Sequence, residues 1–415
     1  MLLREIRVEN ILSFGQAQLE LRPLNVLIGP NASGKSNLLR TLGLLRALPK
    51  DLQKEISEKG GLRSWVNQKT KGTAQIRILG DLDQPFDYQI SFGEVAQRFE
   101  IFSEKYAGVF ERQEGDVILA PLSLHDKLIE YNPGNGGFPR VLYHMDLAPS
   151  GKTFASAAEA PSGLGWVDTP NKFSRLFQLS RSESALAMIR HPSERRIQQL
   201  SDALESIRLY RGFNTGSHAG TRDGIASTAR ADRLSEDGSN VALVLNEINF
   251  GQGLARFNKS LQRFCDFFED VRVLTRSGIT QFYIKEQNVD EAFAASSLSD
   301  GTLRLICLLA ILLQPEPPGL VCIEEPETGM HPDSIRMLAE LLAEASTRTQ
   351  LIVTTHSPAL VDALSDQPEA IIVCERNLQG FTEFRRLRNS DLDQWLERYS
   401  LGQLWEKGEI GGNRW

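Results

Sequence analysis

The sequence predicts an α/β fold in which a mixed sheet is assembled from both chain ends and carries a large inserted α+β lobe. Near the N-terminus, the apolar run 24–28 precedes a glycine-rich turn and a helical pattern over 36–47 that Pro49 terminates. The last third alternates strand-like and helical patterns, with strands expected at 320–323, 351–354 and 371–373 and helices at 303–313 and 334–345. Such alternation implies parallel strands, so we expect both ends to share one sheet.

The other segments follow from their local patterns. Half-buried strands are expected where apolar and polar residues alternate, at 2–8, at 17–21 and three times within 74–104, where they suggest an antiparallel meander. Residues 145–170 are rich in Ala, Ser, Gly and Pro and predict a loop, and the Gly/Ser-rich stretch 212–239 is expected to be mobile. Helical spacing covers 171–210, and one long helical pattern covers 239–268.

Composition excludes several classes of protein. The chain has 46 Lys and Arg against 53 Asp and Glu, a formal charge of −7, which argues against a general nucleic-acid coat protein. The four cysteines show no CxxC spacing, which argues against a disulfide scaffold and for a reducing compartment. Early charges exclude a signal-peptide core, and no apolar run reaches the roughly 18 residues of a membrane helix. We expect a cytoplasmic protein without a membrane partner.

The glycine-rich turn, residues 29–36, has the sequence GPNASGKS and matches the phosphate-binding pattern G-x-x-x-x-G-K-[ST] in full. Gly29 and Gly34 let the backbone curl so that its N–H groups point at phosphate oxygens. Lys35 neutralises the β- and γ-phosphate charge, and the Ser36 hydroxyl ligates Mg²⁺. Because a strand precedes this loop and a helix follows it, the sequence predicts a nucleotide site.

A second motif is the apolar strand LVCIEE, 320–325, which ends in paired carboxylates. Beside a phosphate-binding loop, Glu324 is placed to order the Mg²⁺ shell, and Glu325 is placed to polarise the attacking water as general base. Taken alone, the pair has a second interpretation, an exposed acidic turn after a core strand.

Two weaker signals lie nearby. The sequence LSDGT, 298–302, opens an apolar helix with Ser299 as its N-cap, and a helix start of this kind is either an anion site or an ordinary cap. His356 ends the strand candidate 351–355, where its imidazole is either structural or placed to hydrogen-bond a γ-phosphate or the attacking water.

The ordered set GPNASGKSN, LSDGT, LVCIEEPETGMHPD and VTTHSP resembles the ABC ATPases of the stand-alone RecF/SMC-like branch. The resemblance covers 1–48 and 290–375, and the closing LGQLWEKGEIGG resembles the tail of predicted RecF-like ATPases. It implies a P-loop NTPase fold of the ABC type and ATP hydrolysis with Mg²⁺. It also implies a homodimer that forms on ATP binding, in which each signature motif faces the nucleotide of the other copy.

The resemblance also assigns residue roles. It makes Lys35, Glu325 and His356 the catalytic residues, with His356 as the switch histidine, and Ser36, Glu324 and the Q-loop candidate Gln68 the metal-binding residues. It places the nucleotide on the Walker A loop and the signature motif, namely Gly29, Pro30, Asn31, Ala32, Ser33, Gly34, Lys35, Ser36, Asn37, Ser299, Asp300 and Gly301. Thr328 to His331 match the D-loop, at the expected subunit contact.

The same alignment of motifs divides the chain into four expected parts. Two of them, 1–60 with Walker A and 286–415 with the signature, Walker B and the switch histidine, form the ATPase head. Between them, 61–145 supply head-associated antiparallel strands, and 146–285 form an inserted helical and loop lobe. No long coiled coil and no Toprim-like acidic cluster is visible, which favours a compact RecF-like protein.

Positive charge is concentrated in one segment. The eleven basic residues of 171–235 outnumber its six acidic residues, a local charge of +5 in a chain of charge −7. Tyr210 and Phe213 lie beside Arg208 and Arg211 and add candidate stacking surfaces. The segment is either a DNA-binding face or a solvated helix surface that pairs with acidic side chains of the head.

Two functional hypotheses follow. In the first, ATP-dependent dimerisation of the heads controls DNA binding in repair or genome maintenance. In the second, the chain is the regulatory ATPase subunit of an anti-phage defence or toxin-like complex and gates a partner effector protein. A transporter ATPase is disfavoured, because the inserted lobe is too large and no membrane-facing segment is visible.

Overall fold

The computed structural model describes the chain except for some segments, and it divides the chain into two compact units. The described residues are 2–70, 72–95, 98–108, 110–111, 117–118, 124–130, 140–145, 166–169, 172–175, 182–188, 195–250, 253–392 and 398–412. Unit 1 comprises 1–22, 37–207 and 375–384, and unit 2 comprises 23–36, 208–374 and 385–415. Each unit is described separately.

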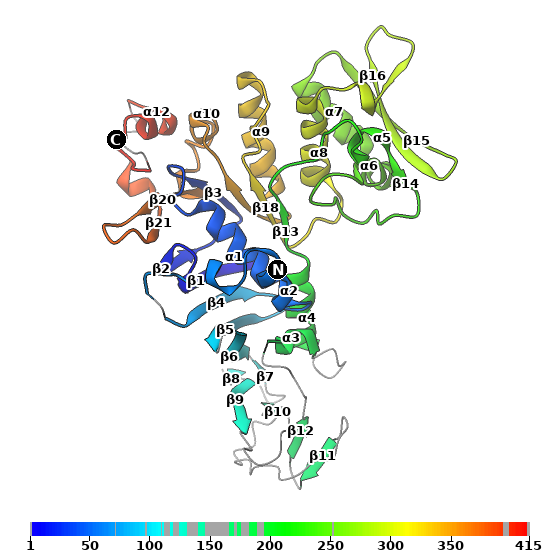
Figure 1. Ribbon diagram of the computed structural model, residues 1–415. Helices are drawn as coiled ribbons and strands as arrows, with labels where there is room; N and C mark the ends of the chain where they lie inside the picture. Colours follow the sequence, from blue (N-terminus) through cyan, green and yellow to red (C-terminus); the bar gives the residue numbers. More distant parts are fainter. Residues whose placement is uncertain are drawn as a thin grey trace. The chain divides into compact units, whose positions relative to one another are not determined.

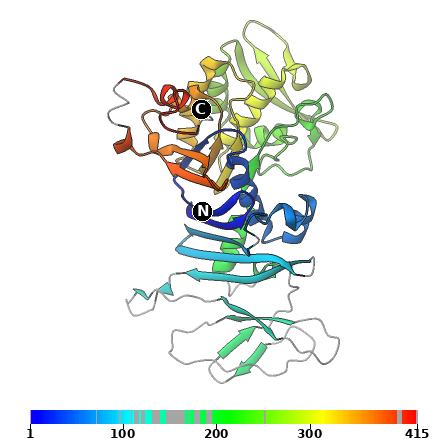
Figure 2. The ribbon, with the colours of Figure 1, turned by 60° about the vertical axis from the view of Figure 1, so that its left-hand side comes forward.

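Unit 1 is built on a five-stranded sheet of order β2-β1-β4-β5-β6, in which the neighbouring strands are antiparallel. Its strands are β1 (Leu2–Ile11), β2 (Phe14–Glu20), β4 (Ala74–Asp81), β5 (Pro85–Val95) and β6 (Arg98–Gly108). In β4 every second residue is buried, as expected for a sheet covered on one face. The long blue-to-cyan strands lie side by side in Figure 2, which confirms the predicted meander.

The helices and short strands of unit 1 complete it. The helices are α2 (Leu52–Glu58), η1 (Leu62–Ser64), α3 (Ala185–Met188), α4 (Arg195–Glu205) and most of α1 (Lys35–Ala47), whose first two residues belong to unit 2. The short strands pair as hairpins: β7 (Phe110–Glu111) with β8 (Val117–Ile118), β9 (Leu124–Glu130) with β10 (Arg140–Met145), and β11 (Trp166–Thr169) with β12 (Lys172–Arg175).

A six-stranded sheet, which lies in unit 2 except for residues 375–376 of its fifth strand and 382–384 of its sixth, confirms the predicted α/β architecture. Its order is β13-β18-β19-β3-β20-β21, and the pairings from β13 to β20 are parallel. The strands are β3 (Leu24–Ile28), β13 (Arg208–Tyr210), β18 (Leu320–Glu324), β19 (Gln350–Thr354), β20 (Ile371–Arg376) and β21 (Thr382–Arg386). Figure 1 shows β3 in blue and β20 and β21 in orange, so the sheet combines both chain ends.

Helices cover this sheet and form one hydrophobic core with it. They are α8 (Asp300–Leu313), α9 (Pro332–Ala345), α10 (Pro358–Asp362), η4 (Pro368–Ala370), η5 (Asn389–Asp391) and α12 (Leu401–Glu406). Helix α8 is buried along almost its whole length from Leu303 to Leu313, which a helix enclosed by neighbours requires. β3 and β19 are buried at every position, as expected for central parallel strands.

A second sheet of unit 2 has the order β14-β16-β15, with β17 paired to β16. Its strands are β14 (Ile225–Ala226), β15 (Phe268–Arg276), β16 (Ile279–Glu286) and β17 (Ala292–Ala294), and its helices are α5 (Gly220–Asp223), α6 (Val241–Phe250), α7 (Leu254–Phe264) and η3 (Ala295–Ser297). Leu245, Phe257 and Phe282 are fully buried and join these elements to the core of α8.

Three predictions about segments were wrong or incomplete. The continuous helix expected at 239–268 is two helices, α6 and α7, with Gly251 and Gly253 in the sequence between them. The helical stretch 171–210 also contains strands β12 and β13. Residues 212–239, expected to be mobile, contain α5 and β14 and are tied by side-chain hydrogen bonds of Asn240 to the carbonyls of Arg230 and Arg233.

The predicted loop 145–170 lies almost wholly outside the described residues. The four-part division at 60, 145 and 285 stays a prediction. β13, from within 146–285, belongs to the six-stranded sheet.

Candidate functional site

The six-stranded sheet brings the predicted motifs of unit 2 to one edge. β3, β19 and β18 are neighbours and parallel, so their carboxyl ends lie together. The segment 29–36 follows β3, Glu325 follows β18, and His356 lies two residues beyond β19. Parallel pairing thus gathers residues that are far apart in the sequence.

The loop 29–36 adopts a conformation that requires its glycines. Gly29 has φ +146° and Gly34 has φ +115°, in the region that L-residues rarely adopt. A Cβ at Gly29 would lie only 2.2 Å from the carbonyl oxygen of Cys374 at β20. The first glycine therefore lets the loop leave the sheet edge tightly, which fits a loop whose backbone wraps a phosphate.

Lys35 is the buried cation of this loop. Its Nζ donates to the carbonyl oxygens of Gly29 at 2.6 Å and Pro30 at 3.1 Å, and only 7% of the residue is exposed. Burial lowers the pKa of Lys35, and Cys374, Glu325 and Glu324 act in the opposite direction. The ammonium group thus lies within electrostatic reach of both predicted acids.

Other residues of the loop 29–36 are either exposed or buried and hydrogen-bonded. Asn31, Ala32 and Ser36 are exposed, whereas Ser33 is buried with its N–H donating to the carbonyl of Pro30 at 3.2 Å. In unit 1, the amide of Asn37 donates to the hydroxyl of Ser13 at 2.8 Å.

The paired acids at the end of β18 differ in environment. Glu324 Oε1 is buried and has no hydrogen-bond partner among the described residues. The Glu325 side chain is half exposed, and its backbone is in the left-handed region with φ +45°. The Glu325 N–H donates to the carbonyl of Thr354 at 2.9 Å. A strained backbone at a non-glycine residue is characteristic of functional positions. The orphaned oxygen of Glu324 and the exposed hydroxyl of Ser36 fit the oxygen ligands of Mg²⁺.

His356 lies against Glu325, with Nε2 3.7 Å from Glu325 Oε1. Burial lowers the pKa of His356, the charge of Lys35 lowers it further, and Glu325 and Glu327 raise it. The imidazole is therefore disposed to be neutral near pH 7. Lys35, Glu325 and His356 form one electrostatically coupled group.

Glu327 is a functional candidate that our sequence analysis missed. Its Oε1 accepts a hydrogen bond from the Thr355 hydroxyl at 2.6 Å and one from the His356 N–H at 3.1 Å. The carboxylate thus ties the turn after the paired acids to the strand end that carries His356. A third acid so close to Glu324 and Glu325 was the available signal.

The predicted signature motif forms the start of α8. Ser299 is the N-cap and accepts a hydrogen bond from the Thr302 N–H at 3.1 Å. Ser299 and Asp300 are exposed, and the Asp300 carboxylate pairs with Arg222 at 2.6 Å. A Cβ at Gly301 would lie 2.9 Å from the carbonyl oxygen of Gly329, so the motif contacts the D-loop segment directly.

The D-loop segment, Thr328 to His331, is a tight turn. The Thr328 N–H donates to the Glu325 carbonyl at 3.0 Å, and Gly329 has φ +83°. His331 is the N-cap of α9, where its Nδ1 accepts from the Asp333 N–H at 3.3 Å. The turn therefore connects the predicted general base to the signature motif within one chain.

Gln68 belongs to unit 1, so its predicted role as a metal ligand stays a prediction. Its amide nitrogen donates to the carbonyls of Arg63 at 2.7 Å and Val66 at 3.0 Å. In the described part of the chain, no group of three or more His, Cys, Asp or Glu side chains is arranged to hold a metal ion by itself.

The basic segment 171–235 lies partly outside the described residues and is divided between the two units. Arg230 and Arg233 pair with Asp232, and Arg222 is only 13% exposed. Tyr210, expected as a stacking surface, is buried, and its hydroxyl donates to the Leu234 carbonyl at 3.0 Å. That expectation was wrong, because strand β13 places Tyr210 in the core.

One family profile matches the chain over residues 24–113 and 161–362, which is more than two thirds of its length. The family is described as "AAA domain, putative AbiEii toxin, Type IV TA system". The match includes the segments that carry the Walker A, signature, Walker B and switch motifs. No curated protein matches the sequence significantly.

Solved structures match the fold at low sequence identity. An Smc head bound to the C-winged helix domain of ScpA has a TM-score of 0.54 at 11% identity, with 94% of this chain and 99% of that chain covered. An Smc head with an extended coiled coil bound to the C-terminal domain of ScpA, from Pyrococcus furiosus, has a TM-score of 0.52 at 11% identity, with 95% and 98% covered. These matches show an SMC-head-like fold. Within the described residues, no helix has the length and apolar character needed to cross a bilayer.

Proposed function

The chain belongs to the AAA-domain family described as putative AbiEii toxin, Type IV TA system, and from this premise we propose that it is a Mg²⁺-dependent ATPase. One observation carries the proposal. Lys35 of the phosphate-binding loop, the acid Glu325 and His356 form one electrostatically coupled group at the carboxyl edge of a parallel sheet. A phosphate-binding lysine, a candidate base and a candidate γ-phosphate contact are the elements that phosphoryl transfer to water requires.

The residues divide the chemistry among them. The backbone N–H groups of 29–36 and the Lys35 ammonium hold the β- and γ-phosphates. Ser36 and Glu324 hold Mg²⁺, which supplies neutralisation of the phosphate charge. Glu325 accepts the proton of the water that attacks the γ-phosphorus as the bond to ADP breaks. Neutral His356 orients that water or the γ-phosphate by a hydrogen bond.

The second part of the proposal is that ATP closes two copies of the chain on each other. The signature residues Ser299 and Asp300 are exposed at the start of α8, where N–H groups are available to an anion. In the family that the motifs resemble, this helix start faces the γ-phosphate held by the other copy. Gly301 contacts Gly329, which lies in the turn after Glu325, so closure at the signature motif is transmitted to the general base through this turn.

Two downstream roles are open to such a dimer. The family description favours a regulatory ATPase of a toxin-like or defence complex that gates a partner protein. Control of DNA binding in repair is the second candidate, and it is supported by the +5 charge of 171–235. Burial of Tyr210 and pairing of Arg222, Arg230 and Arg233 reduce the basic and stacking surface available to DNA.

The experiment uses Glu325→Gln to hold ATP unhydrolysed. We expect steady-state hydrolysis by the unchanged chain, its loss in Lys35→Ala, and an ATP-dependent dimer of Glu325→Gln in analytical ultracentrifugation. In that background, Ser299→Arg should abolish dimerisation. Ser277→Arg should not, because Ser277 is an exposed position of unit 2 in the β15–β16 turn, away from the signature motif in the sequence. A Glu325→Gln protein that remains monomeric with saturating ATP and Mg²⁺ refutes the dimer.

The two downstream roles separate in a binding measurement. If the dimer grips DNA, the ATP-bound Glu325→Gln protein should bind duplex DNA with an affinity that falls steeply as salt rises. No binding to duplex or single-stranded DNA at low salt excludes the DNA role and leaves the partner-protein role.

A further inference from the structure

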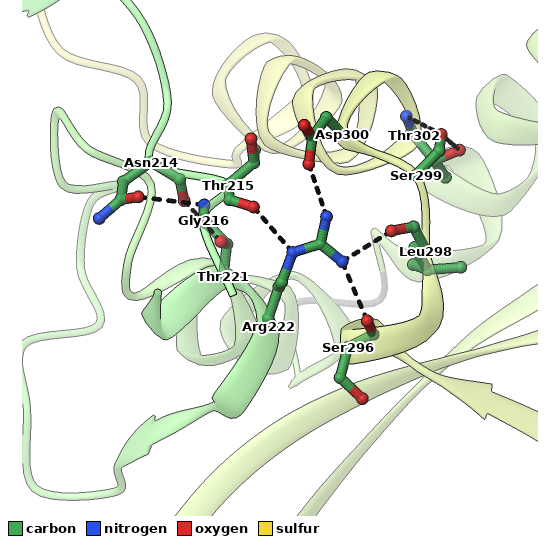
Figure 3. Close-up of polar contacts among 10 residues, drawn as sticks. All are labelled: Asn214, Thr215, Gly216, Thr221, Arg222, Ser296, Leu298, Ser299, Asp300 and Thr302. Carbon is green, nitrogen blue, oxygen red and sulfur yellow. Dashed lines mark hydrogen bonds and ion pairs between the residues drawn. The ribbon is translucent and has the colours of Figure 1, made fainter. Parts of the chain in front are cut away.

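Arg222 occupies the centre of a polar cluster at the start of α8, shown in Figure 3. Its Nε donates to the Thr215 carbonyl at 2.7 Å, and its Nη1 donates to the carbonyls of Ser296 at 3.0 Å and Leu298 at 2.7 Å. Its Nη2 donates to Asp300 Oδ1 at 2.6 Å. One guanidinium therefore binds three backbone carbonyls and the carboxylate of the signature motif.

The loop that carries Arg222 is itself held in place. The Thr221 hydroxyl donates to the Asn214 carbonyl at 2.6 Å, and the Gly216 N–H donates to Asn214 Oδ1 at 3.2 Å. Figure 3 shows these contacts to the left of Arg222. The Arg222 side chain is only 13% exposed, and its hydrogen bonds to three carbonyls hold the guanidinium beside Asp300.

Asp300 creates an electrostatic conflict that Arg222 resolves. A carboxylate in the first turn of a helix is stabilised by the helix dipole. The same carboxylate repels a phosphate that approaches the helix start, because the two groups carry like charge. The hydrogen bond from Arg222, followed by one from Thr215, lowers the pKa of Asp300, so the carboxylate is ionised and paired. The pair as a whole carries no net charge.

We propose that Arg222 is a positioning residue of the nucleotide site: it neutralises Asp300 and fixes the start of α8 so that this helix can accept the γ-phosphate held by a second copy of the chain. The inference rests on the proposed ATP-dependent dimer. Arg222 touches neither nucleotide nor water in this role; it acts through Asp300. The alternative is a purely structural tie between residues 215 and 296–298.

Charge neutralisation and a structural tie predict different results for the double variant Arg222→Met with Asp300→Asn. Arg222→Met keeps the aliphatic stem but leaves Asp300 uncompensated, and in the Glu325→Gln background we expect ATP-dependent dimerisation to weaken about tenfold. Asp300→Asn alone removes the charge that opposes the phosphate, so its dimerisation serves as the reference for the double variant. Arg222→Met with Asp300→Asn should recover to within about threefold of Asp300→Asn, since the repelling charge is gone.

Two further measurements keep the result interpretable if Arg222→Met loses stability. Arg222→Lys keeps the charge without the forked contacts to Ser296 and Leu298, so it should dimerise nearly as the parent does while melting at a lower temperature. The defect of Arg222→Met should also shrink as salt rises. The matched control is Arg272→Met, which removes an arginine–carboxylate pair with Asp270 on β15 and should leave dimerisation unchanged.

The outcomes separate the two proposals. A Glu325→Gln parent that never dimerises with ATP refutes the proposed function before Arg222 is varied. A parent that dimerises, with a double variant no better than Arg222→Met, refutes the role of Arg222 in neutralising Asp300. Equal loss in Arg222→Lys and Arg222→Met, without salt dependence, refutes it as well.

Discussion

Replacing Glu327 by glutamine is expected to slow ATP hydrolysis while leaving nucleotide affinity nearly unchanged. Glu327 Oε1 accepts hydrogen bonds from the Thr355 hydroxyl at 2.6 Å and the His356 N–H at 3.1 Å. Glutamine has a similar size but carries no charge, so both bonds weaken and His356 loses its fixed position. None of the groups of 29–36 that we propose to bind phosphate is altered.

The magnitude follows from the two bonds. Hydrogen bonds to a charged group contribute about 1.5–3 kcal/mol each, against about 0.5–1.5 kcal/mol for neutral pairs. Glu327 is partly exposed, so solvent reduces the difference, and we expect about 1–2 kcal/mol in total. If that energy supports only the reactive arrangement, kcat falls roughly 5- to 30-fold.

The assay combines steady-state kinetics with a double-mutant cycle. Thr355→Val removes the hydroxyl donor from the other side of the same contact. We expect the effects of Glu327→Gln and Thr355→Val to be non-additive by about 1 kcal/mol. Glu344→Gln is the control, because Glu344 forms an exposed ion pair with Arg256 and should not affect kcat.

The pH profile gives an independent readout. Glu327 raises the pKa of His356 against the larger effects of burial and Lys35. Removing the charge of Glu327 therefore lowers the pKa of His356 further, and the limb of the kcat profile that reports His356 moves to lower pH. Additive effects in the cycle, together with an unmoved limb, would refute the reasoning.

Three other outcomes are expected. Burial raises the pKa of Glu104 in the folded state. The neutral carboxyl therefore stabilises the folded state below the unfolded pKa, and this stabilisation is lost as pH rises through the folded pKa. In urea unfolding, the free energy of unfolding of Glu104→Gln should rise relative to that of the unchanged chain over that pH range. Gly412→Ala should weaken nucleotide binding more than Gly278→Ala. Both glycines have a left-handed backbone conformation. A Cβ at Gly412 would lie 3.4 Å from Gly29 Cα, whereas a Cβ at Gly278 would have no heavy atom of the described residues within 4 Å. Ser36→Ala should raise the Mg²⁺ concentration needed for hydrolysis, and titration after chelator treatment measures it.

The P-loop could be predicted from the sequence because its chemistry is local. Eight contiguous residues, GPNASGKS, carry the glycines, the lysine and the hydroxyl that the site needs. The apolar strands beside it were equally visible, since central parallel strands are buried on both faces and therefore continuously apolar. Most helix and strand positions in the two chain ends follow from such short-range patterns.

Contacts between distant segments escaped prediction. Glu327 and His356 are separated in the sequence by α9 and β19, and Arg222 contacts Asp300 from a Gly/Ser-rich segment that suggested mobility. The local pattern 208–210 gave no sign that β13 pairs with β18, and this pairing buries Tyr210. The +5 charge of 171–235 is an arithmetic property of the segment, whereas the partners of its arginines are a property of the fold.

The sequence by itself determined the α/β class, the phosphate-binding loop and the acids at the end of β18, because each depends on residues that are adjacent in the chain. Only the tertiary structure decided which groups act together. Parallel pairing of β18, β19 and β3 brings Glu325, His356 and Lys35 to one edge, and the packing of α5 against η3, which directly precedes α8, pairs Arg222 with Asp300. Proximity of this kind arises from how the core buries its strands and helices, and no local pattern encodes it.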